Sequence, residues 1–194
     1  MAELHLVRCM NRSVAFTLLL FAAIARADLI WVGASPDKKL SEVVWRIPDP
    51  HQPSRLDLAG FTLFICTAEH CIRMWTACPC VQPRSIRRSI IAQHTFPRRM
   101  VSEIRWSPDS RFLLFTTASS GGHSPWHFNT YVFRAADKSF RDVESVVHST
   151  VGSGDFRFEA PDVAVLTVNV VPAESVREIK LPLGKVAHRM QRLE

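Results

Sequence analysis

Short apolar runs, separated by turn-forming residues, make up most of the chain. Several runs alternate apolar and polar positions or are rich in β-branched and aromatic residues, and clusters of glycine, proline, aspartate and serine separate them. This pattern predicts antiparallel β-strands; the segment 86–96 also fits a short helix, but its isoleucines, threonine and phenylalanine favour a strand. The expected strands are residues 29–32, 41–47, 58–67, 86–96, 101–106, 112–117, 130–133, 140–143, 156–159, 163–170 and 176–181.

A helical pattern is found near the end of the sequence. Between Gly184 and Arg192, Val186 and Met190 fall on one side of a helix and basic residues on the other. No break between the expected strands is long enough to be an interdomain linker. The sequence therefore predicts an all-β fold, a single antiparallel meander domain that carries a short C-terminal helix.

Residues 106–117 predict a β-hairpin in detail. Pro108 fixes the backbone angle φ that the second position of a type I turn requires, and the side chains of Ser107 and Asp109 can hydrogen-bond to the turn backbone. The apolar run Phe112–Thr117 then forms the second strand.

This hairpin resembles the repeat of TolB-type β-propellers, exported bacterial proteins whose blades carry a Trp-Ser-Pro-Asp-Gly turn and an aromatic-rich second strand. The chain departs from the pattern at Ser110, where a residue other than glycine costs on the order of 1 kcal/mol. With strands at 130–133 and 140–143, residues 103–145 have about the length of one four-stranded blade. The resemblance implies protein partners and no active site. The matching residues are Trp106, Ser107, Pro108, Asp109, Phe112, Leu114 and Phe115.

The first 27 residues have the pattern of a secretory signal peptide. Arg8 and Arg12 precede the apolar run Val14–Ile24, and Ala25-Arg26-Ala27 supplies small residues at the two positions that determine cleavage. The alternative is a membrane anchor, but the run is shorter than the roughly 20 apolar residues that a span requires. Cys9 precedes the run, so the arrangement of a lipoprotein signal is absent. We expect a periplasmic or secreted domain, residues 28–194, with no stable membrane insertion after cleavage.

The formal net charge is +6, and removal of residues 1–27, with three arginines and one glutamate, lowers it to +4, which is mildly basic. A nucleic-acid binder would concentrate more charge on one face, so we expect no nucleic-acid partner. Between Leu58 and Ser102 the one acidic residue, Glu69, stands among many arginines, which predicts either a basic surface for an acidic partner or a solvated loop or edge strand. The arginines are Arg73, Arg84, Arg87, Arg88, Arg98 and Arg99.

Four cysteines would remain in the mature chain, an even number in an oxidising compartment, which favours disulfides over free thiols. Three pairings are open, and a Cys78–Cys80 bridge is the most strained of the candidates. The spacing does not match the paired C-x2-C sequences of structural zinc sites, and no C-x-x-C redox pair occurs. The disulfide candidates are Cys66, Cys71, Cys78 and Cys80.

The loop 119–130 is the first candidate for binding, because it is longer than a hairpin turn needs and is rich in aromatic residues. Alternatively, Trp126 and Phe128 cover the hydrophobic core and the two histidines are satisfied hydrogen-bonding residues. Gly121, Gly122 and Pro125 disfavour the helix on which two histidines four residues apart share a metal. The candidate binding residues are His123, Trp126, His127, Phe128 and Tyr131.

No catalytic motif is found in the sequence. The acidic group Asp155, Glu159 and Asp162 is better explained as solvated turn carboxylates than as a general acid and base. Our first hypothesis is a non-catalytic exported β module, without cofactor or metal, that contacts an envelope or secreted protein. Unpaired strand edges also favour a homodimer formed through those edges. The alternative is a small-ligand or metal-dependent activity at the 119–131 loop, built with Asp155 or Glu159.

Overall fold

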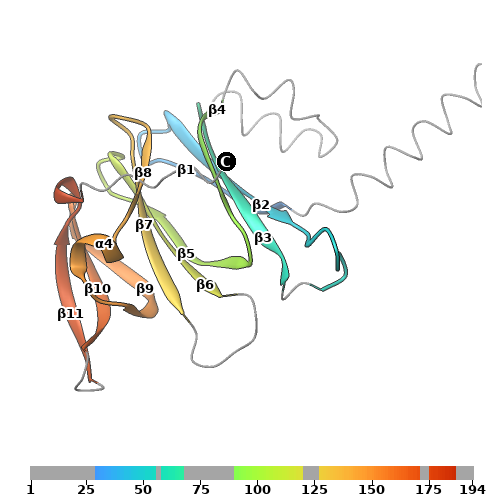
Figure 1. Ribbon diagram of the computed structural model, residues 1–194. Coiled ribbons are helices and arrows are strands. Elements are labelled where there is room, and N and C mark those ends of the chain that lie inside the picture. Colours follow the sequence, from blue (N-terminus) through green and yellow to red (C-terminus); the bar gives the residue numbers. More distant parts are fainter. Residues whose placement is uncertain (1–28, 56–57, 68–89, 120–126, 171–174, 187–194) are drawn as a thin grey trace, which may run out of the picture.

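A computed structural model describes residues 29–55, 58–67, 90–119, 127–170 and 175–186. It has two antiparallel sheets (Figure 1). The first is a four-stranded meander in the order β1-β2-β3-β4. Its strands are β1 (Leu29–Ala34), β2 (Leu40–Ile47), β3 (Gly60–Thr67) and β4 (Ile90–Phe96).

The second sheet has seven strands and combines two meanders. In the first meander β5, β6, β7 and β8 pair in sequence order; in the second, β9 pairs with β10 and β10 with β11. The two meanders are joined at one residue pair, Phe128 of β7 with Val151 of β9. The strands are β5 (Arg99–Trp106), β6 (Phe112–Ser119), β7 (Phe128–Arg134), β8 (Ser139–Asp142), β9 (Val151–Ala160), β10 (Val163–Val170) and β11 (Ser175–Pro182).

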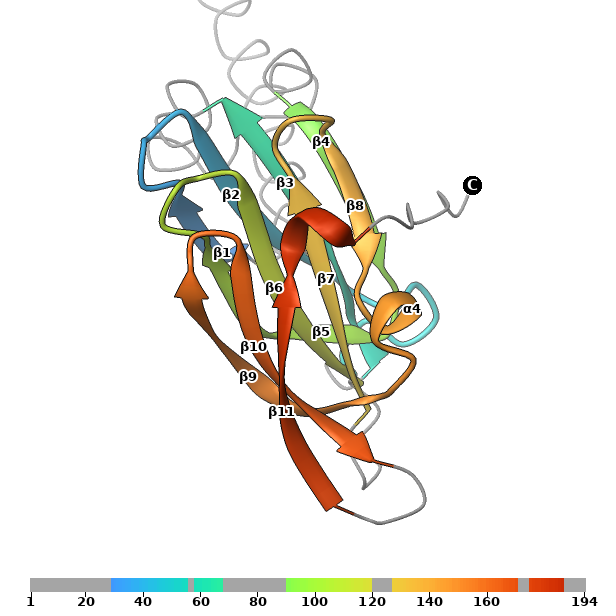
Figure 2. The ribbon, with the colours of Figure 1, turned by 90° about the vertical axis from the view of Figure 1, so that its left-hand side faces the viewer.

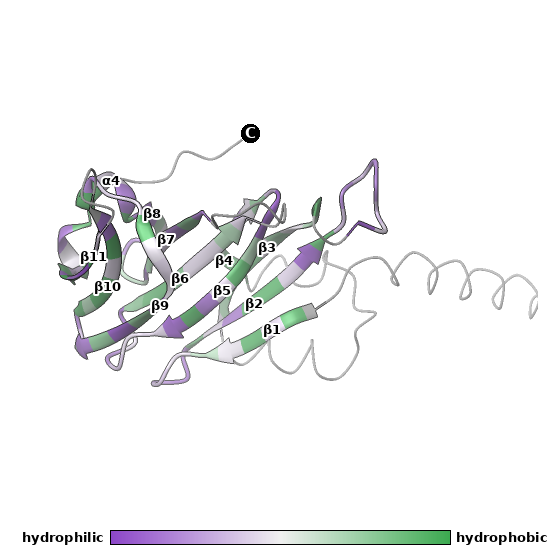
Figure 3. Cartoon of the chain, turned by 90° about the horizontal axis from the view of Figure 1, so that it is seen from below, coloured by the Kyte–Doolittle hydropathy of each residue, from purple (hydrophilic) through white to green (hydrophobic). Residues whose placement is uncertain are grey.

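The two larger hydrophobic cores separate the first sheet, β5–β8 and β9–β11 into three layers, with β6 in the middle layer. Along β6 successive side chains point to opposite faces. Leu113 and Phe115 join the core that faces the first sheet, and Phe112 and Leu114 join the core that faces β9–β11. In Figure 3 apolar and hydrophilic segments alternate along the strands, whereas the turns at strand ends are hydrophilic.

The hairpin predicted at residues 106–117 is confirmed. The backbone N–H of Ser107 donates to the carbonyl oxygen of Phe112 (2.8 Å), and the N–H of Phe112 donates to Ser107 Oγ (3.0 Å). Ser107 Oγ in turn donates to Asp109 Oδ1 (2.7 Å). The serine and aspartate therefore close the turn, as the sequence predicts.

The same turn occurs a second time, between β1 and β2. Ser35 N–H donates to the Leu40 carbonyl (2.9 Å), Leu40 N–H to Ser35 Oγ (3.0 Å), and Ser35 Oγ to Asp37 Oδ1 (2.7 Å). The two turns are in contact, because Asp37 N–H donates to Ser110 Oγ at 2.9 Å. The β1–β2, β5–β6 and β9–β10 turns lie along one side of the molecule (Figure 2). Only the turn at Ser107 was predicted from the sequence; the turn at Ser35 was not.

The all-β antiparallel prediction is confirmed, and β5–β8 form the four-stranded meander expected at 103–145. Phe128 begins strand β7, although the sequence analysis assigned it to the preceding loop. A short helix, α4 (Glu144–Val147), was not predicted. The expected helix at 184–192 is, in its described part, a 3-10 turn η2 (Leu183–Lys185) followed by Val186 in extended backbone. None of the described helices is long and apolar enough to span a membrane.

Candidate functional site

Of the predicted binding residues, the structure describes His127, Phe128 and Tyr131; His123 and Trp126 lie outside the described residues. His127 is exposed, and its carbonyl accepts hydrogen bonds from Arg99 Nη1 (3.0 Å) and Ser119 N–H (3.2 Å). Phe128 is half-buried and pairs with Ala118 of β6. The structure therefore fixes the base of this loop to the sheet.

Tyr131 belongs to the aromatic core more than to the loop. Its ring centre lies 5.0 Å from that of Phe96 and 5.4 Å from that of Phe115. Burial raises the pKa of its hydroxyl. The ring therefore packs against the core that faces the first sheet, and a binding role for Tyr131 stays a prediction.

The acidic residues considered for catalysis are spread over the β9–β10 hairpin. Asp155 is exposed, Glu159 forms an ion pair with Lys180 Nζ (2.6 Å), and the Asp162 carbonyl accepts the Leu183 N–H (2.8 Å). Within the described ranges, no three side chains of His, Cys, Asp or Glu lie close enough to hold a metal ion together.

Cys66 is fully buried in β3 beside Val43. The other three disulfide candidates, Cys71, Cys78 and Cys80, lie outside the described residues. The burial of Cys66 is compatible with the predicted disulfide, whose pairing stays a prediction.

A polar cavity of about 390 Å³ lies beside helix α4. Glu144 accepts hydrogen bonds there from Asn129 Nδ2 (2.5 Å) and Val151 N–H (3.4 Å), and burial raises its pKa. Asn129 Oδ1 is buried without a hydrogen-bond partner in the described structure. This cavity can accept a small polar molecule that donates hydrogen bonds. Its lining residues are Glu144, His148, Ser149, Thr150 and Asn169.

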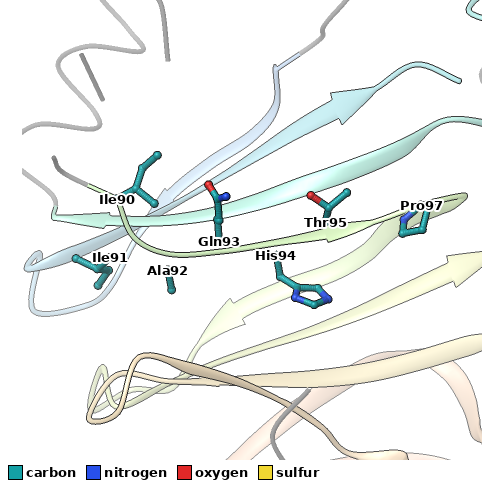
Figure 4. Close-up of a pocket in the computed structure, with 7 residues that line it drawn as sticks. All are labelled: Ile90, Ile91, Ala92, Gln93, His94, Thr95 and Pro97. Carbon is teal, nitrogen blue, oxygen red and sulfur yellow. The ribbon is translucent and has the colours of Figure 1, made fainter. Parts of the chain in front are cut away.

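A larger cavity, of about 440 Å³, runs along strand β4, the outer strand of the first sheet (Figure 4). Among the described strands, β4 pairs with β3 alone; we call its other side the β4 edge. In Figure 4, Gln93 and Thr95 project to one side of the strand and His94 to the other. The lining residues are Ile90, Ile91, Ala92, Gln93, His94, Thr95 and Pro97.

His94 packs β4 against the layer formed by β5–β8. Its ring is buried, 4.7 Å from the ring centre of Phe96 and 5.8 Å from that of Phe140 in β8. Burial lowers the pKa of the imidazole, so the ring is neutral in the folded protein at neutral pH. On the opposite side, Thr95 Oγ1 shares a hydrogen bond with Thr62 Oγ1 (2.9 Å). These contacts hold both faces of β4 in place, and no described strand pairs with the β4 edge.

The outer strands of the two sheets differ in charge. β5, β8 and β11 each contain charged residues, the device by which natural proteins block unwanted strand pairing. β4 (IIAQHTF) and β1 (LIWVGA) contain no Asp, Glu, Lys or Arg. The first sheet therefore presents uncharged strands at both of its edges. The absence of charge is visible in both segments of the sequence, but it does not by itself predict that these strands stand at the edges.

A buried carboxylate connects the first sheet to the second. Glu42 of β2 is 3% exposed and accepts hydrogen bonds from Trp31 Nε1 (3.1 Å) and Trp106 Nε1 (2.5 Å). Burial raises its pKa, against the effect of the two indole donors. Gly33 leaves room for it, since a Cβ there would lie 2.0 Å from Glu42 Oε1. No local sequence pattern predicts the contact between Glu42 and Trp106, because these residues are 64 positions apart.

Comparisons with known proteins found no matching family model, no matching curated protein and no matching solved structure.

Proposed function

We propose that this chain is a non-catalytic, exported β module that binds an envelope or secreted protein by adding a strand of that protein to the β4 edge. The observation that carries the proposal is an uncharged outer strand with a cavity along its length. Because no described strand pairs with the β4 edge, it offers a row of backbone N–H and C=O groups, whereas the outer strands β5 and β11 of the second sheet carry charges that discourage such pairing.

The chemistry of β4 specifies the kind of partner segment that fits. Main-chain hydrogen bonds give affinity in strand addition, and side chains on alternate positions give specificity. Ile90, Gln93 and Thr95 offer an apolar and amide-bearing surface without charge. An extended, uncharged segment with apolar side chains is therefore the best match, because it loses no charge solvation on binding.

Two features of the sequence agree with this proposal. The pattern of residues 1–27 is that of a secretory signal, and the hairpin at 106–117 resembles a repeat of exported proteins that act through protein partners.

In this proposal the aromatic loop 119–131 is a further contact region, and the substitution Trp126→Ala tests it. Loss of partner binding with an unchanged fold would keep the loop in the site, and unchanged binding would remove it.

Site-specific photo-crosslinking tests the β4 edge. A photoreactive amino acid replaces Gln93 in the full chain, produced in its native host, and the matched control carries it at Gln52, an exposed glutamine in the β2–β3 loop. We expect one crosslinked protein from position 93 that is absent from position 52, and loss of that crosslink when Thr95 is changed to lysine. No crosslink at position 93, or the same products at both positions, would contradict the proposal.

The polar cavity beside α4 favours one second candidate, binding of a small polar ligand near the base of the 119–131 loop. Its specific support is the half-buried carboxylate of Glu144, which lines the cavity beside the polar side chains of Thr150 and Asn169. Native mass spectrometry of the purified protein tests it: a bound small molecule that is lost in Glu144→Gln is the expected result. A mass equal to that of the polypeptide alone counts against this candidate.

A further inference from the structure

Two exposed apolar side chains of the first sheet are neighbours at the start of β1, and a third lies at the end of β2. Ile30 is 40% exposed, Trp31 47% and Ile47 37%. Leu29 pairs with Trp45 of β2, which places Ile47 at the same end of the hairpin as Ile30. The β1–β2 register shifts between Leu29 and Trp31, so Ile30 lies in a β-bulge. Bulges on outer strands redirect side chains, and clustered exposed apolar residues mark interaction sites.

Trp31 is held in place despite its exposure. Its indole N–H donates to Glu42 Oε1 at 3.1 Å, and Glu42 is itself buried and bound to Trp106. A half-exposed aromatic ring with a fixed orientation loses little conformational entropy on binding, which is typical of residues that dominate interface energies.

The charge pattern indicates what pairs with this strand. Apart from β2, no described strand pairs with β1; we call the open side the β1 edge. In a symmetric dimer the same strand meets itself in antiparallel orientation. For β5 or β11 such pairing would bring charged residues into the contact, whereas every register of LIWVGA against itself is free of charge. In a chain of net charge +6, an uncharged strand is where two copies approach with least repulsion.

We propose that β1 of one copy pairs antiparallel with β1 of a second copy, so that two first sheets join into one continuous sheet. This inference goes beyond the proposed function, because it uses the opposite edge of the first sheet and leaves β4 open to another protein. Trp31 and Ile30 of both copies flank the new strand pair.

Sedimentation velocity over a wide concentration range tests the dimer on the mature chain. We expect the wild type to form a dimer as concentration rises and Ile30→Lys to weaken it by roughly tenfold or more, since each copy brings a charge to the contact. The matched control is Val176→Lys, an equivalent change on the outer strand β11 at a side chain that is 63% exposed. It should dimerise like the wild type, as should Gln93→Lys at the β4 edge.

Hydrogen exchange of the unmodified protein provides a second readout that does not depend on a variant's folding. Amides of 29–34 should become more protected in concentrated samples, while those of β11 (175–182) stay unchanged. A wild type that remains monomeric at all concentrations would overturn the inference. So would equal weakening of the dimer by Ile30→Lys and Val176→Lys, or protection that rises in β11 and not in β1.

Discussion

At the scale of single residues, two buried titratable groups lie between the first sheet and β5–β8. Glu42 has a raised pKa and His94 a lowered one, and in both cases burial is the largest cause. Burial disfavours the charged form of each group, so both are driven toward neutrality in the folded state. Their effects on stability therefore have opposite dependence on pH.

Glu42 should make the protein less stable as pH rises. With a folded-state pKa above its ordinary value of 4.5, the folded protein holds this proton more tightly than the unfolded chain does. Its contribution is therefore fully present below pH 4.5 and is lost as pH rises through the raised pKa. Glu42→Gln should remove this decline, because an amide does not titrate. Urea unfolding at a series of pH values measures it, and parallel curves for both proteins would contradict the prediction.

His94 should make the protein less stable as pH falls. Its folded-state pKa lies below 6.5, so below that pH the unfolded chain binds the proton first and unfolding is favoured. His94→Phe should remove this acid sensitivity while keeping an aromatic ring against Phe96 and Phe140. The measurement is thermal unfolding between mildly acidic and neutral pH. An unchanged acid dependence in the variant would show that another group is responsible.

At the scale of elements, the Ser-Pro-Asp turn defines the first hairpin of each four-stranded meander. It was identified at Ser107 because an aromatic residue precedes it and an aromatic-rich strand follows. Its copy at Ser35 is preceded by Gly33-Ala34 and followed by Lys39 and Leu40, which hides the likeness. The two turns make the same hydrogen bonds, which shows the repeat even though the residues that flank the turns differ.

The two turns should respond differently to glycine. Lys38 and Ser110 both have positive φ, 58° and 62°, a conformation that costs a non-glycine residue about 1 kcal/mol. Lys38→Gly should relieve that cost and stabilise the protein by roughly 0.5 kcal/mol after the added entropy of the unfolded chain. Ser110→Gly also removes the hydroxyl that accepts Asp37 N–H, a loss of about 1 kcal/mol. Chemical denaturation should therefore rank Lys38→Gly above Ser110→Gly, and the reverse order would contradict this account.

At the scale of the whole molecule, β6 is shared by the two cores. Leu113 and Leu114 are neighbours in sequence, both fully buried, and they pack on opposite sides of the middle layer. A strand buried on both faces couples the layers, because losing it would expose both cores to water.

Leu113→Ala and Leu114→Ala should each lower the free energy of unfolding by about 2–5 kcal/mol. Because both layers depend on β6, each variant should still unfold in one transition by tryptophan fluorescence and by circular dichroism. Val176→Ala, at an exposed site, is the control and should stay within about 0.5 kcal/mol of the wild type. Separate transitions in either leucine variant would show that the layers unfold independently.

The candidate site was only partly predictable from sequence. The pattern of 86–96 favours a strand, but the aromatic residues of the 119–131 loop point to that loop for binding. Of its candidate residues the structure describes His127, Phe128 and the core-packed Tyr131. The β4 edge was missed because an uncharged strand in the middle of a sheet and one at its edge have the same local pattern.

The sequence by itself determined where the strands lie, how the Ser107 turn closes and that the fold is antiparallel, because these depend on alternation and turn chemistry within a few residues. Only the tertiary structure decided which strands stand at the edges, that β6 lies between two cores, and that Trp31 and Trp106 meet on Glu42. These features depend on contacts between residues that are distant in sequence, and the free energy of those contacts depends on how the layers pack together. The pattern of neighbouring residues therefore does not predict them.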